Sequence, residues 1–308
     1  MPAVPTMISE QWARFVLPIV RKEWMQQMDA VVSPVSALFG VESSTSSVEY
    51  SQGLGNGGLV PEYNGADDPS NAQIQYDSFN PLYETTFTHK EYAKGLQIGR
   101  KLWDDNQSGL IRRKASALGI EYGQTRATHA ASIFNNAFSA SYVGADSKAL
   151  CATDHPTSPT DSTSISNKGT TALSYAAVKT VLQAGRRMKN DRNIPMPMFY
   201  DTLIVPVELE ETAAEFLQAA GKPGTADNDA NAIRSLRVIS DPYLTDVNNW
   251  FMVDSAQARL HLLWFNRVQP ELSLDPTSDF NLVARYRGYM RYSYGWDDFR
   301  WCYGNEVA

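Results

Sequence analysis

The sequence predicts an α+β fold in which helices dominate the middle of the chain and long strands close it. Residues 108–138 contain no proline and repeat apolar side chains on one helical face, which indicates a single long helix. Residues 258–265 and 282–296 are rich in aromatic and other strand-forming residues, which favours strands. Because helices and strands do not alternate regularly, the order is typical of α+β architecture.

Length and composition limit the class of protein. The 308 residues, 43% of them apolar and 20% charged, suit a globular chain of roughly one to three domains. The net charge of −7 argues against dedicated nucleic-acid binding, which relies on clustered Lys and Arg. No signal-peptide pattern and no run of roughly 18 apolar residues is present. Two cysteines, Cys151 and Cys302, are too few for a disulfide framework. We therefore expect a soluble protein made in a reducing cytoplasm, with no membrane partner.

The first predicted element is an amphipathic helix from Ser9 to Val31. Ser9 is a candidate N-cap, and Pro18 should bend the helix or split it in two. Apolar residues recur at spacings of three and four, at Trp12, Phe15, Val16, Ile19 and Val20. Two interpretations remain open: a helix packed on its own core, or an arm packed on a neighbouring molecule.

Residues 34–80 predict a long loop, rich in Ser, Gly, Asn and Asp, with SSTSS at 43–47 and GLGNGG at 53–58. A loop of this length is usually functional or disordered. Between Lys22 and Lys90 there is no Lys or Arg. The same stretch carries acids at Glu23, Asp29, Glu42, Glu49, Glu62, Asp67, Asp68, Asp77 and Glu84.

The charge then reverses. Basic residues follow at Lys90, Lys94, Arg100, Lys101, Arg112, Arg113, Lys114 and Arg126. One interpretation is two unrelated solvated surfaces. The other is complementarity, with the acidic segment of one subunit lying over the basic region of the next.

The long helix at 108–138 begins at Ser108, a candidate cap, and would run on the order of 45 Å at 1.5 Å per residue. This is more than twice the average helix of roughly 11–12 residues, so we expect a structural spine. Gly119 and Gly123 are expected to be weak points or places of close approach.

A second α/β region follows a polar segment. Ser174 should cap a helix that continues to Lys189, and 199–205 should form a buried strand. Pro206 then stands where a helix would start, and Gly221 where it would end. Further strands are predicted at 236–239 and 250–253, and Gly288 predicts a bulge or bend in the last long strand.

Few residues suggest chemistry. None of His89, His129, His155 and His261 has a partner at metal-site spacing, and we expect His129, in the long helix, and His261, in a strand, to be packed or surface residues. Cys151 near Asp154 and His155 could form a nucleophile and base, but catalytic Cys and His are rarely sequence neighbours. Asp154 and the following residues read better as a turn.

Phosphate and base recognition are also poorly supported. The glycines of 53–58 are not expected to follow a strand and open a helix, as phosphate loops do. Aromatic residues near the end predict a strand-face core: Tyr289, Tyr292, Tyr294, Trp296, Phe299, Trp301 and Tyr303. We expect no catalytic residue, no cofactor and no metal ligand.

Several ordered segments resemble one known family. They are KLWDDNQSG at 101–109, LCATDHP at 150–156, SN at 166–167, LSYAAVKTVLQAGRRMKNDRNIP at 173–195, DTLIVPVELEETAAEFL at 201–217, ISDPYLTDVNNWFMV at 239–253 and RYSYGWDDFRWCYGN at 291–305. Together with the order of elements they resemble the tailed-phage major capsid proteins with the HK97-like fold, and within them the Mu-type major head subunits. The first 80 residues match only in architecture.

The resemblance implies five parts. These are an N-terminal arm (1–46), an extended loop (47–89), a peripheral domain with the spine helix (90–150), an axial α/β domain (151–256), and return strands with the C-terminus (257–308). It implies hexamers and pentamers that form an icosahedral shell around double-stranded DNA, with the extended loop over a neighbour. A portal protein, and scaffold or decoration proteins, would be partners; DNA contact would be weak. The protein would be made in the bacterial cytoplasm and reside in the virion.

Some relatives cross-link their shells through a lysine of the extended loop. Because this segment has no lysine, we expect no such cross-link. The start at Met1 leaves no room for a scaffolding segment before the arm, so we expect a separate scaffold protein or none. Two alternatives are a cellular nanocompartment shell of the same fold, and an unrelated hydrolase that uses Cys151 and His155.

Overall fold

The chain forms two compact units, seen in a computed structural model. The structure describes residues 9–55, 58–60, 76, 81–218, 231, 233–275 and 282–308. Unit 1 comprises Met1–Glu49, Thr88–Ser132 and Trp264–Tyr294, and unit 2 comprises Tyr50–Phe87, Ile133–Leu263 and Gly295–Ala308.

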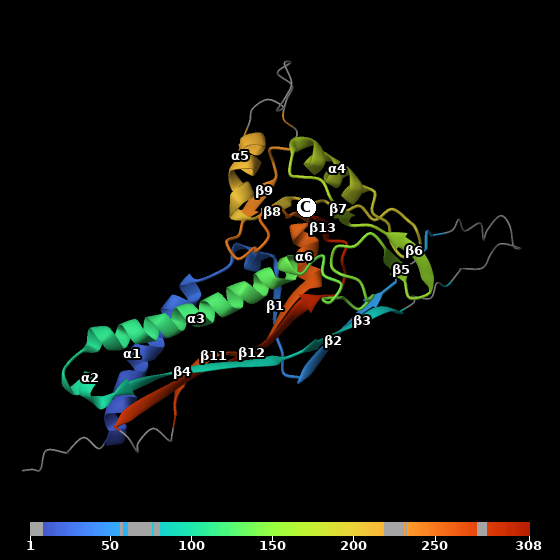
Figure 1. The fold of residues 1–308 in the computed structure, drawn as a ribbon. Coiled ribbons are helices and arrows are strands. Elements are labelled where there is room, and N and C mark those ends of the chain that lie inside the picture. The colour runs from blue at the N-terminus through green and yellow to red at the C-terminus, as the bar shows by residue number, and fades with distance from the viewer. Residues whose placement is uncertain are drawn as a thin grey trace, which may run out of the picture. The chain divides into compact units, whose positions relative to one another are not determined.

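Unit 1 contains two long helices, α1 (Ser9–Ala30) and α3 (Ser108–Asn135), which cross (Figure 1). The predicted spine helix is confirmed. In α1 the apolar stripe is buried within unit 1, at Trp12, Val16, Val20, Trp24 and Met28. The helix therefore packs on its own core. Of the two outcomes predicted for Pro18, bending or splitting the helix, splitting is wrong. One helix continues through this exposed residue, where water can replace the lost hydrogen bond.

Glycines in α3 permit the crossing. A Cβ on Gly119 would lie 2.4 Å from the carbonyl oxygen of Trp24, and one on Gly123 would lie 2.7 Å from Cβ of Val31. Both glycines are therefore sites of close approach, as expected. Between them Tyr122 packs edge-on against the Trp24 ring at 5.3 Å.

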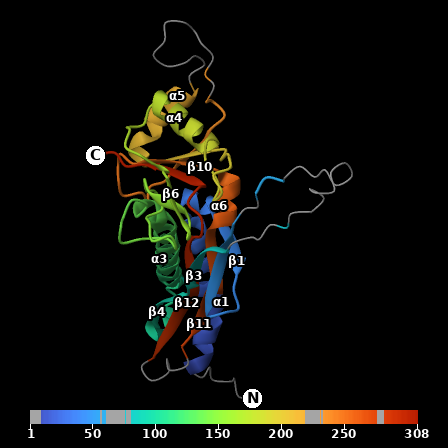
Figure 2. The same ribbon diagram turned by 90° about the vertical axis from the view of Figure 1, so that its right-hand side faces the viewer.

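The helices cover one face of a four-stranded sheet in the order β1-β11-β12-β4 (Figure 2). The strands are β1 (Gly40–Ser43), β11 (Leu262–Leu274), β12 (Val283–Trp296) and β4 (Lys90–Gly99), and β12 runs antiparallel to β4. The short helices η1 (Pro34–Leu38) and α2 (Arg100–Asp104) complete the unit.

Gly288 does not form a bulge, so this part of the prediction of a bulge or bend is wrong. The β12–β4 register is continuous through the pair Gly288–Lys94. Glycine is needed for space, because a Cβ there would lie 2.6 Å from the Tyr122 hydroxyl. That hydroxyl accepts from the Lys94 N–H at 2.6 Å and donates to the Lys94 carbonyl at 2.9 Å. Tyr122 thus fixes β4 beneath α3.

The predicted strand at 258–265 is wrong in its first half. Residues Ser255–His261 form α6, and β11 begins at Leu262. The carboxylate of Asp254 caps the helix by accepting from the N–H groups of Ala256 and Gln257. This cap outweighs the strand preference of the following residues.

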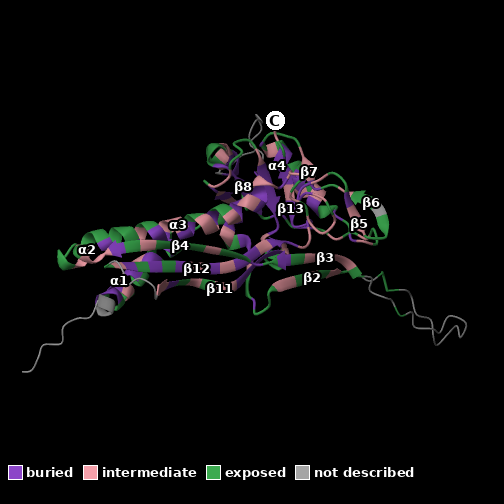
Figure 3. Ribbon diagram, turned by 60° about the horizontal axis from the view of Figure 1, so that its bottom comes forward, coloured by how far each residue is buried: buried purple, intermediate pink, exposed green. Residues whose placement is uncertain are grey.

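Unit 2 is built on a five-stranded sheet in the order β7-β13-β10-β8-β9. The strands are β7 (Lys168–Gly169), β13 (Cys302–Asn305), β10 (Trp250–Val253), β8 (Thr202–Val205) and β9 (Arg237–Ser240). The central strand β10 is antiparallel to both β8 and β13, and every residue in it is buried. Figure 3 shows buried residues gathered around the neighbouring strands β8 and β13. The predicted strands at 236–239 and 250–253 are confirmed to within one residue.

Helices α4 (Tyr175–Arg186) and α5 (Glu210–Gln218) pack on this sheet. Ser174 caps α4 as predicted, by accepting from the Ala177 N–H, although the helix ends before Lys189. Pro206 precedes the short helix η3 (Val207–Leu209), which leads into α5. The predicted stop at Gly221 lies outside the described residues.

Two hairpins complete unit 2. One pairs β2 (Val48–Leu54) with β3 (Pro81–Thr88), and the other pairs β5 (His155–Ser158) with β6 (Asp161–Ile165). Residues 34–54 are therefore not an irregular loop, since they form η1, β1 and β2. The predicted turn at Asp154 is also wrong, because β5 starts at His155.

Candidate assembly surfaces

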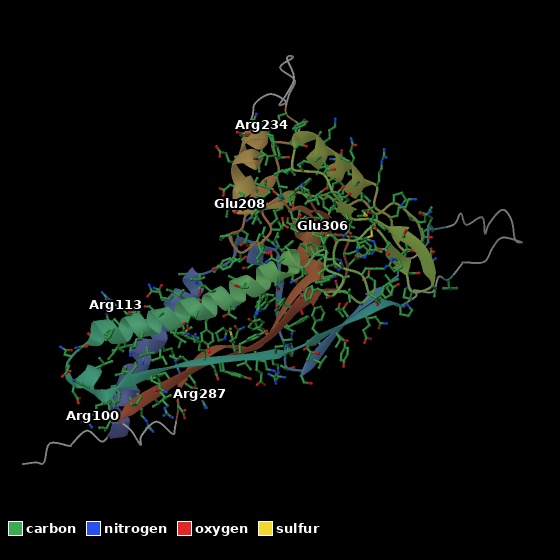
Figure 4. All side chains as sticks on the ribbon, viewed as in Figure 1. Arg100, Arg113, Glu208, Arg234, Arg287 and Glu306 are labelled. Atoms are coloured by element: carbon green, nitrogen blue, oxygen red, sulfur yellow. The ribbon has the colours of Figure 1, made fainter. Side chains whose placement is uncertain are left out.

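One face of the unit 1 sheet is turned away from the helices and carries arginines. Successive strand residues point to opposite faces. On β12 the buried Tyr286 faces the helices and donates to the Ala13 carbonyl of α1 at 2.8 Å. Its neighbours Arg285 and Arg287 are exposed on the other face. Figure 4 shows Arg287 on the opposite side of the unit from Arg113 of α3.

Two further arginines lie in the same sheet, on β11 and β12. The Nε atoms of Arg267 and Arg291 are buried and have no hydrogen-bond partner within the described part of the chain. Glu91 Oε1 lies 3.8 Å from Arg291 Nε, beyond hydrogen-bond distance. A buried donor without an acceptor costs about 1–3 kcal/mol. Because these Nε atoms are shielded from other molecules, a partner's carboxylates would bind the exposed guanidinium groups of Arg285 and Arg287.

These arginines were missed in the sequence, where the basic region was placed at 90–126. The available signal is the alternate spacing of Arg285, Arg287 and Arg291 along a predicted strand. The residues that were predicted are spread over β4, α2 and α3, and several have acidic partners within unit 1. The pairs are Lys94–Glu121 at 2.9 Å, Arg100–Asp104 at 3.4 Å and Arg112–Glu23 at 3.9 Å.

The acidic segment, residues 23–89, offers carboxylates that could pair with these arginines. It has no Lys or Arg between Lys22 and Lys90, and Glu42 and Glu84 are exposed. The same segment exposes 79% of Leu59 and 95% of Val60. Large apolar side chains left in water next to acids are typical of a surface that a partner covers.

Unit 1 also contains an apolar pocket of about 140 Å³ between the end of α1, η1, β1, α3 and β11. Its rim exposes Val32 and Val41, and the Arg126 guanidinium lies 5.7 Å above the Trp264 ring that lines it. Cofactor sites usually have volumes of roughly 300–1,000 Å³. The pocket is therefore of a size for a side chain.

A buried histidine, His89, lies at the C-terminal end of the acidic segment. His89 lies between β3 and β4, with Nε2 3.0 Å from Ser44 Oγ and Nδ1 3.0 Å from Ser293 Oγ. Ser44 Oγ in turn donates to Glu49 Oε1 at 2.5 Å. This chain of bonds suits a neutral ring that donates from Nε2 and accepts at Nδ1. No local sequence pattern predicts this arrangement.

The contributions of His89 in unit 1 and His261 in unit 2 to stability should change with pH in opposite directions. Burial, with Arg291 adding to it, lowers the pKa of His89. Burial also opposes the charged form of His261, but the hydrogen bond to Asp297 Oδ1 at 2.8 Å and nearby carboxylates outweigh it, so the pKa of His261 is raised. The stabilisation from neutral His89 is present above the unfolded value of about 6.5 and is lost as the pH falls below it. The stabilisation from charged His261 is present below about 6.5 and is lost as the pH rises through its folded pKa.

We therefore expect His89→Gln and His261→Gln to change the pH dependence of unfolding with opposite signs. The stability advantage of the unsubstituted protein over His89→Gln should shrink towards acid pH. Its advantage over His261→Gln should shrink towards alkaline pH. Urea unfolding followed by circular dichroism across this range measures both differences, and differences that do not vary with pH would contradict the assignment.

The candidate nucleophile and base have other partners. The buried His155 ring stacks on Phe299 at 3.7 Å, and its Nδ1 lies 2.5 Å from Asp146 Oδ2. The Cys151 sulfur faces that of Cys302 at 3.9 Å. This geometry does not support the hydrolase alternative.

The remaining histidines are packed. His129 Nδ1 lies 2.7 Å from the Tyr292 hydroxyl, and its ring stacks on Tyr294. The aromatic residues predicted to form a strand-face core include Tyr292, Trp296, Phe299 and Trp301, which are all buried. His261 ends α6 and does not lie in a strand.

Ligand signals are few. Within the described ranges, no group of three or more His, Cys, Asp and Glu could hold a metal ion. The GLGNGG segment begins within β2, at Gly53, but residues 58–60 are not helical, so these residues do not form the strand-to-helix turn of a phosphate loop. No helix among the described residues is long and apolar enough to cross a membrane.

Comparison with known proteins identifies the family. A model of the phage capsid protein family matches residues 83–305. No curated protein sequence is similar enough to match the chain. The fold is similar to "Bacteriophage JBD30 capsid" (TM-score 0.54, 14% identity, covering 67% of this chain and 89% of that one). It is also similar to "Capsid structure of the Cyanophage P-SCSP1u" (TM-score 0.54, 11% identity, covering 88% of this chain and 86% of that one). A third similar structure is a virus-like particle from Pyrococcus furiosus (TM-score 0.51, 10% identity, covering 93% of this chain and 97% of that one). The chain belongs to the phage capsid protein family and is a capsid shell protein with the HK97-like fold.

Proposed function

We propose that copies of this chain assemble, as hexamers and pentamers, into the icosahedral shell that encloses the double-stranded DNA of a tailed phage. The outward sheet face with Arg285, Arg287 and Arg291 carries the proposal, since its exposed guanidinium groups, at Arg285 and Arg287, can bind carboxylate acceptors. The acidic segment of a neighbouring copy, which lacks cations between Lys22 and Lys90, can supply them.

In the proposed shell, the subunit has the five parts expected from the sequence. In it, residues 47–89 are the extended loop over the neighbour, residues 90–150 the periphery and residues 151–256 the region around the capsomer axis. We further propose synthesis in the bacterial cytoplasm, attachment to a portal protein, a structural and not an enzymatic role, and only weak contact with packaged DNA. The acidic net charge of −7 suits that last point, because DNA entering the shell should not adhere to its wall. The Mu-type subgroup also remains a proposal.

Arg285→Glu combined with Arg287→Glu should lower the yield of shells by about tenfold or more while the subunit stays folded, because like charges then face each other across the interface. Particle yield is measured by sedimentation and electron microscopy, and folding by circular dichroism. Arg259→Glu, which reverses an exposed arginine of α6 outside both the arginine face and residues 151–256, is the matched control and should assemble normally.

The outcomes separate two levels of the proposal. Normal assembly of the double variant would overturn the role of this face. A protein that never forms large shells, even when made with its own phage's other proteins, would overturn the shell function itself. A ladder of covalent oligomers on a denaturing gel would contradict the expected absence of cross-links.

The similarity to the virus-like particle favours a second candidate, a nanocompartment shell. Nuclease-resistant DNA in purified particles would support the phage head. Particles that enclose protein and no DNA would support the nanocompartment.

A further inference from the structure

The two cysteines of the chain lie together inside unit 2. They are separated by 151 residues in sequence, yet their sulfur atoms are 3.9 Å apart. Cys151 is 1% exposed and Cys302 is 0% exposed. Both are free thiols in this structure. Nothing in the family comparison or in the assembly surfaces gives this pair a role.

Their backbones are held in fixed positions. The Cys151 N–H donates to the Ala137 carbonyl at 2.8 Å, and Cys302 pairs with Val253 in the sheet. The fully buried Asn167 side chain joins the two segments. Its Oδ1 accepts from the Ala152 N–H at 2.9 Å, while its Nδ2 donates to the carbonyls of Leu150 at 2.7 Å and Cys302 at 3.0 Å.

The Cys151 sulfur is packed against β13, the strand that carries Cys302. A Cβ on Gly304 would lie 2.7 Å from the Cys151 sulfur, so this sulfur already fills the space beside the strand. A disulfide needs its sulfurs about 2.05 Å apart, so the present separation of 3.9 Å must shorten by about 2 Å when the bond forms. The separation of the thiols is therefore small while the backbone positions are already set.

We propose that Cys151 and Cys302 form an intramolecular disulfide when the protein passes from a reducing to an oxidising environment, and that this bond stabilises unit 2. The inference concerns the single chain and does not rest on the proposed shell function.

The oxidant is a small-molecule disulfide such as oxidised glutathione. One cysteine thiolate attacks it, forms a mixed disulfide and releases one reduced glutathione. The second cysteine loses its proton to solvent and displaces the second glutathione, which completes the Cys151–Cys302 bond. Two thiols are oxidised and one external disulfide is reduced to two thiols.

The reaction should be slow. Burial, together with the neighbouring Cys151, raises the pKa of the Cys302 thiol, so little thiolate is present at neutral pH. The oxidant also reaches the sulfurs only when unit 2 opens locally. Both effects keep the thiols reduced during synthesis, and the same burial protects the bond once it has formed.

The test starts from protein purified with a reductant and then incubated with oxidised glutathione in mild urea, which permits local opening. Thiol titration after full denaturation should fall from two free thiols per chain to none. Mass spectrometry of non-reduced peptides should find the segments containing Cys151 and Cys302 joined. Because the bond closes a long loop, the midpoint of thermal unfolding should rise by about 10 °C.

Cys151→Ser and Cys302→Ser are the matched controls, and oxidation should leave the unfolding midpoint of each unchanged. Two thiols that stay free after incubation, or joined peptides only between different chains, would overturn the proposal. Thiol counting and peptide mapping use the unsubstituted protein, so they decide the question even where a serine variant fails to fold.

Discussion

Gly119→Ala is expected to lower the free energy of unfolding by about 3 kcal/mol, because it places a methyl group where two helix backbones meet. The new Cβ would lie 2.4 Å from the Trp24 carbonyl oxygen and 3.0 Å from Cβ of Gln27. Neither atom can move aside without shifting α1. The helices would have to separate, which would loosen the packing of the fully buried Trp24. Urea unfolding followed by circular dichroism measures the loss.

Gly109→Ala is the matched control for this experiment. Gly109 lies in the first turn of the same helix, and a Cβ there would meet nothing within 4 Å. Removing glycine from a helix at an open position should change stability by at most about 1 kcal/mol, in the favourable direction. If the two variants behaved alike, α1 and α3 would not cross as closely as the structure shows.

The elements that the sequence predicted well have strong local signals. The helix α3 is long and free of proline, β12 alternates buried and exposed residues, and Ser174 is a cap with a clear position. Gly119 and Gly123 could be singled out for close approach because glycine in a helix interior is unfavourable without such a reason. Their partners on α1 could not be named, since they depend on the tertiary crossing.

The incorrect predictions of secondary structure have two causes. Either a local helix cap was overlooked, or the element depends on a partner that is distant in the sequence. Residues 258–261 look like the start of a strand, but the Asp254 cap makes them helical. Strand β2 was read as loop because its partner β3 begins 33 positions after Val48, at Pro81, across a polar segment. Gly288 predicts a bulge or bend when only its own strand is considered, whereas it leaves room for Tyr122 from another element.

The candidate surfaces follow the same rule. Net acidity and the absence of cations between Lys22 and Lys90 are properties of composition, so the acidic half of the proposed contact was visible in the sequence. The alternate spacing of the β12 arginines was visible there too, but not the side of the sheet that the helices cover, and the Cys151–Cys302 pair requires residues 151 positions apart to meet. No local pattern encodes such distant pairs.

Asn167→Leu should destabilise unit 2 by about 3 kcal/mol, although leucine is close to asparagine in size. The amide is fully buried and bonds to four backbone groups, which are Ala152 N–H and the carbonyls of Leu150, Phe299 and Cys302. Leucine would leave these groups without partners in the interior, at about 1–3 kcal/mol for each buried group that water cannot reach. Because some of these carbonyls can accept other hydrogen bonds, we expect the total loss of stability to stay below the sum of the costs of the four groups.

Two further variants separate the effect of the lost hydrogen bonds from the effect of the side-chain volume. Asn248→Leu replaces an exposed asparagine of the same unit and should change the free energy of unfolding by less than about 0.5 kcal/mol. Asn167→Asp keeps the acceptor for the Ala152 N–H but turns a carboxylate towards three carbonyls. Burial should raise the pKa of that new carboxyl, so the variant should lose stability as the pH rises through the folded pKa of this group. Equal stability of Asn167→Leu and the unsubstituted protein would show that packing alone joins the segments at 150–152 and 302, and that the amide holds nothing in place.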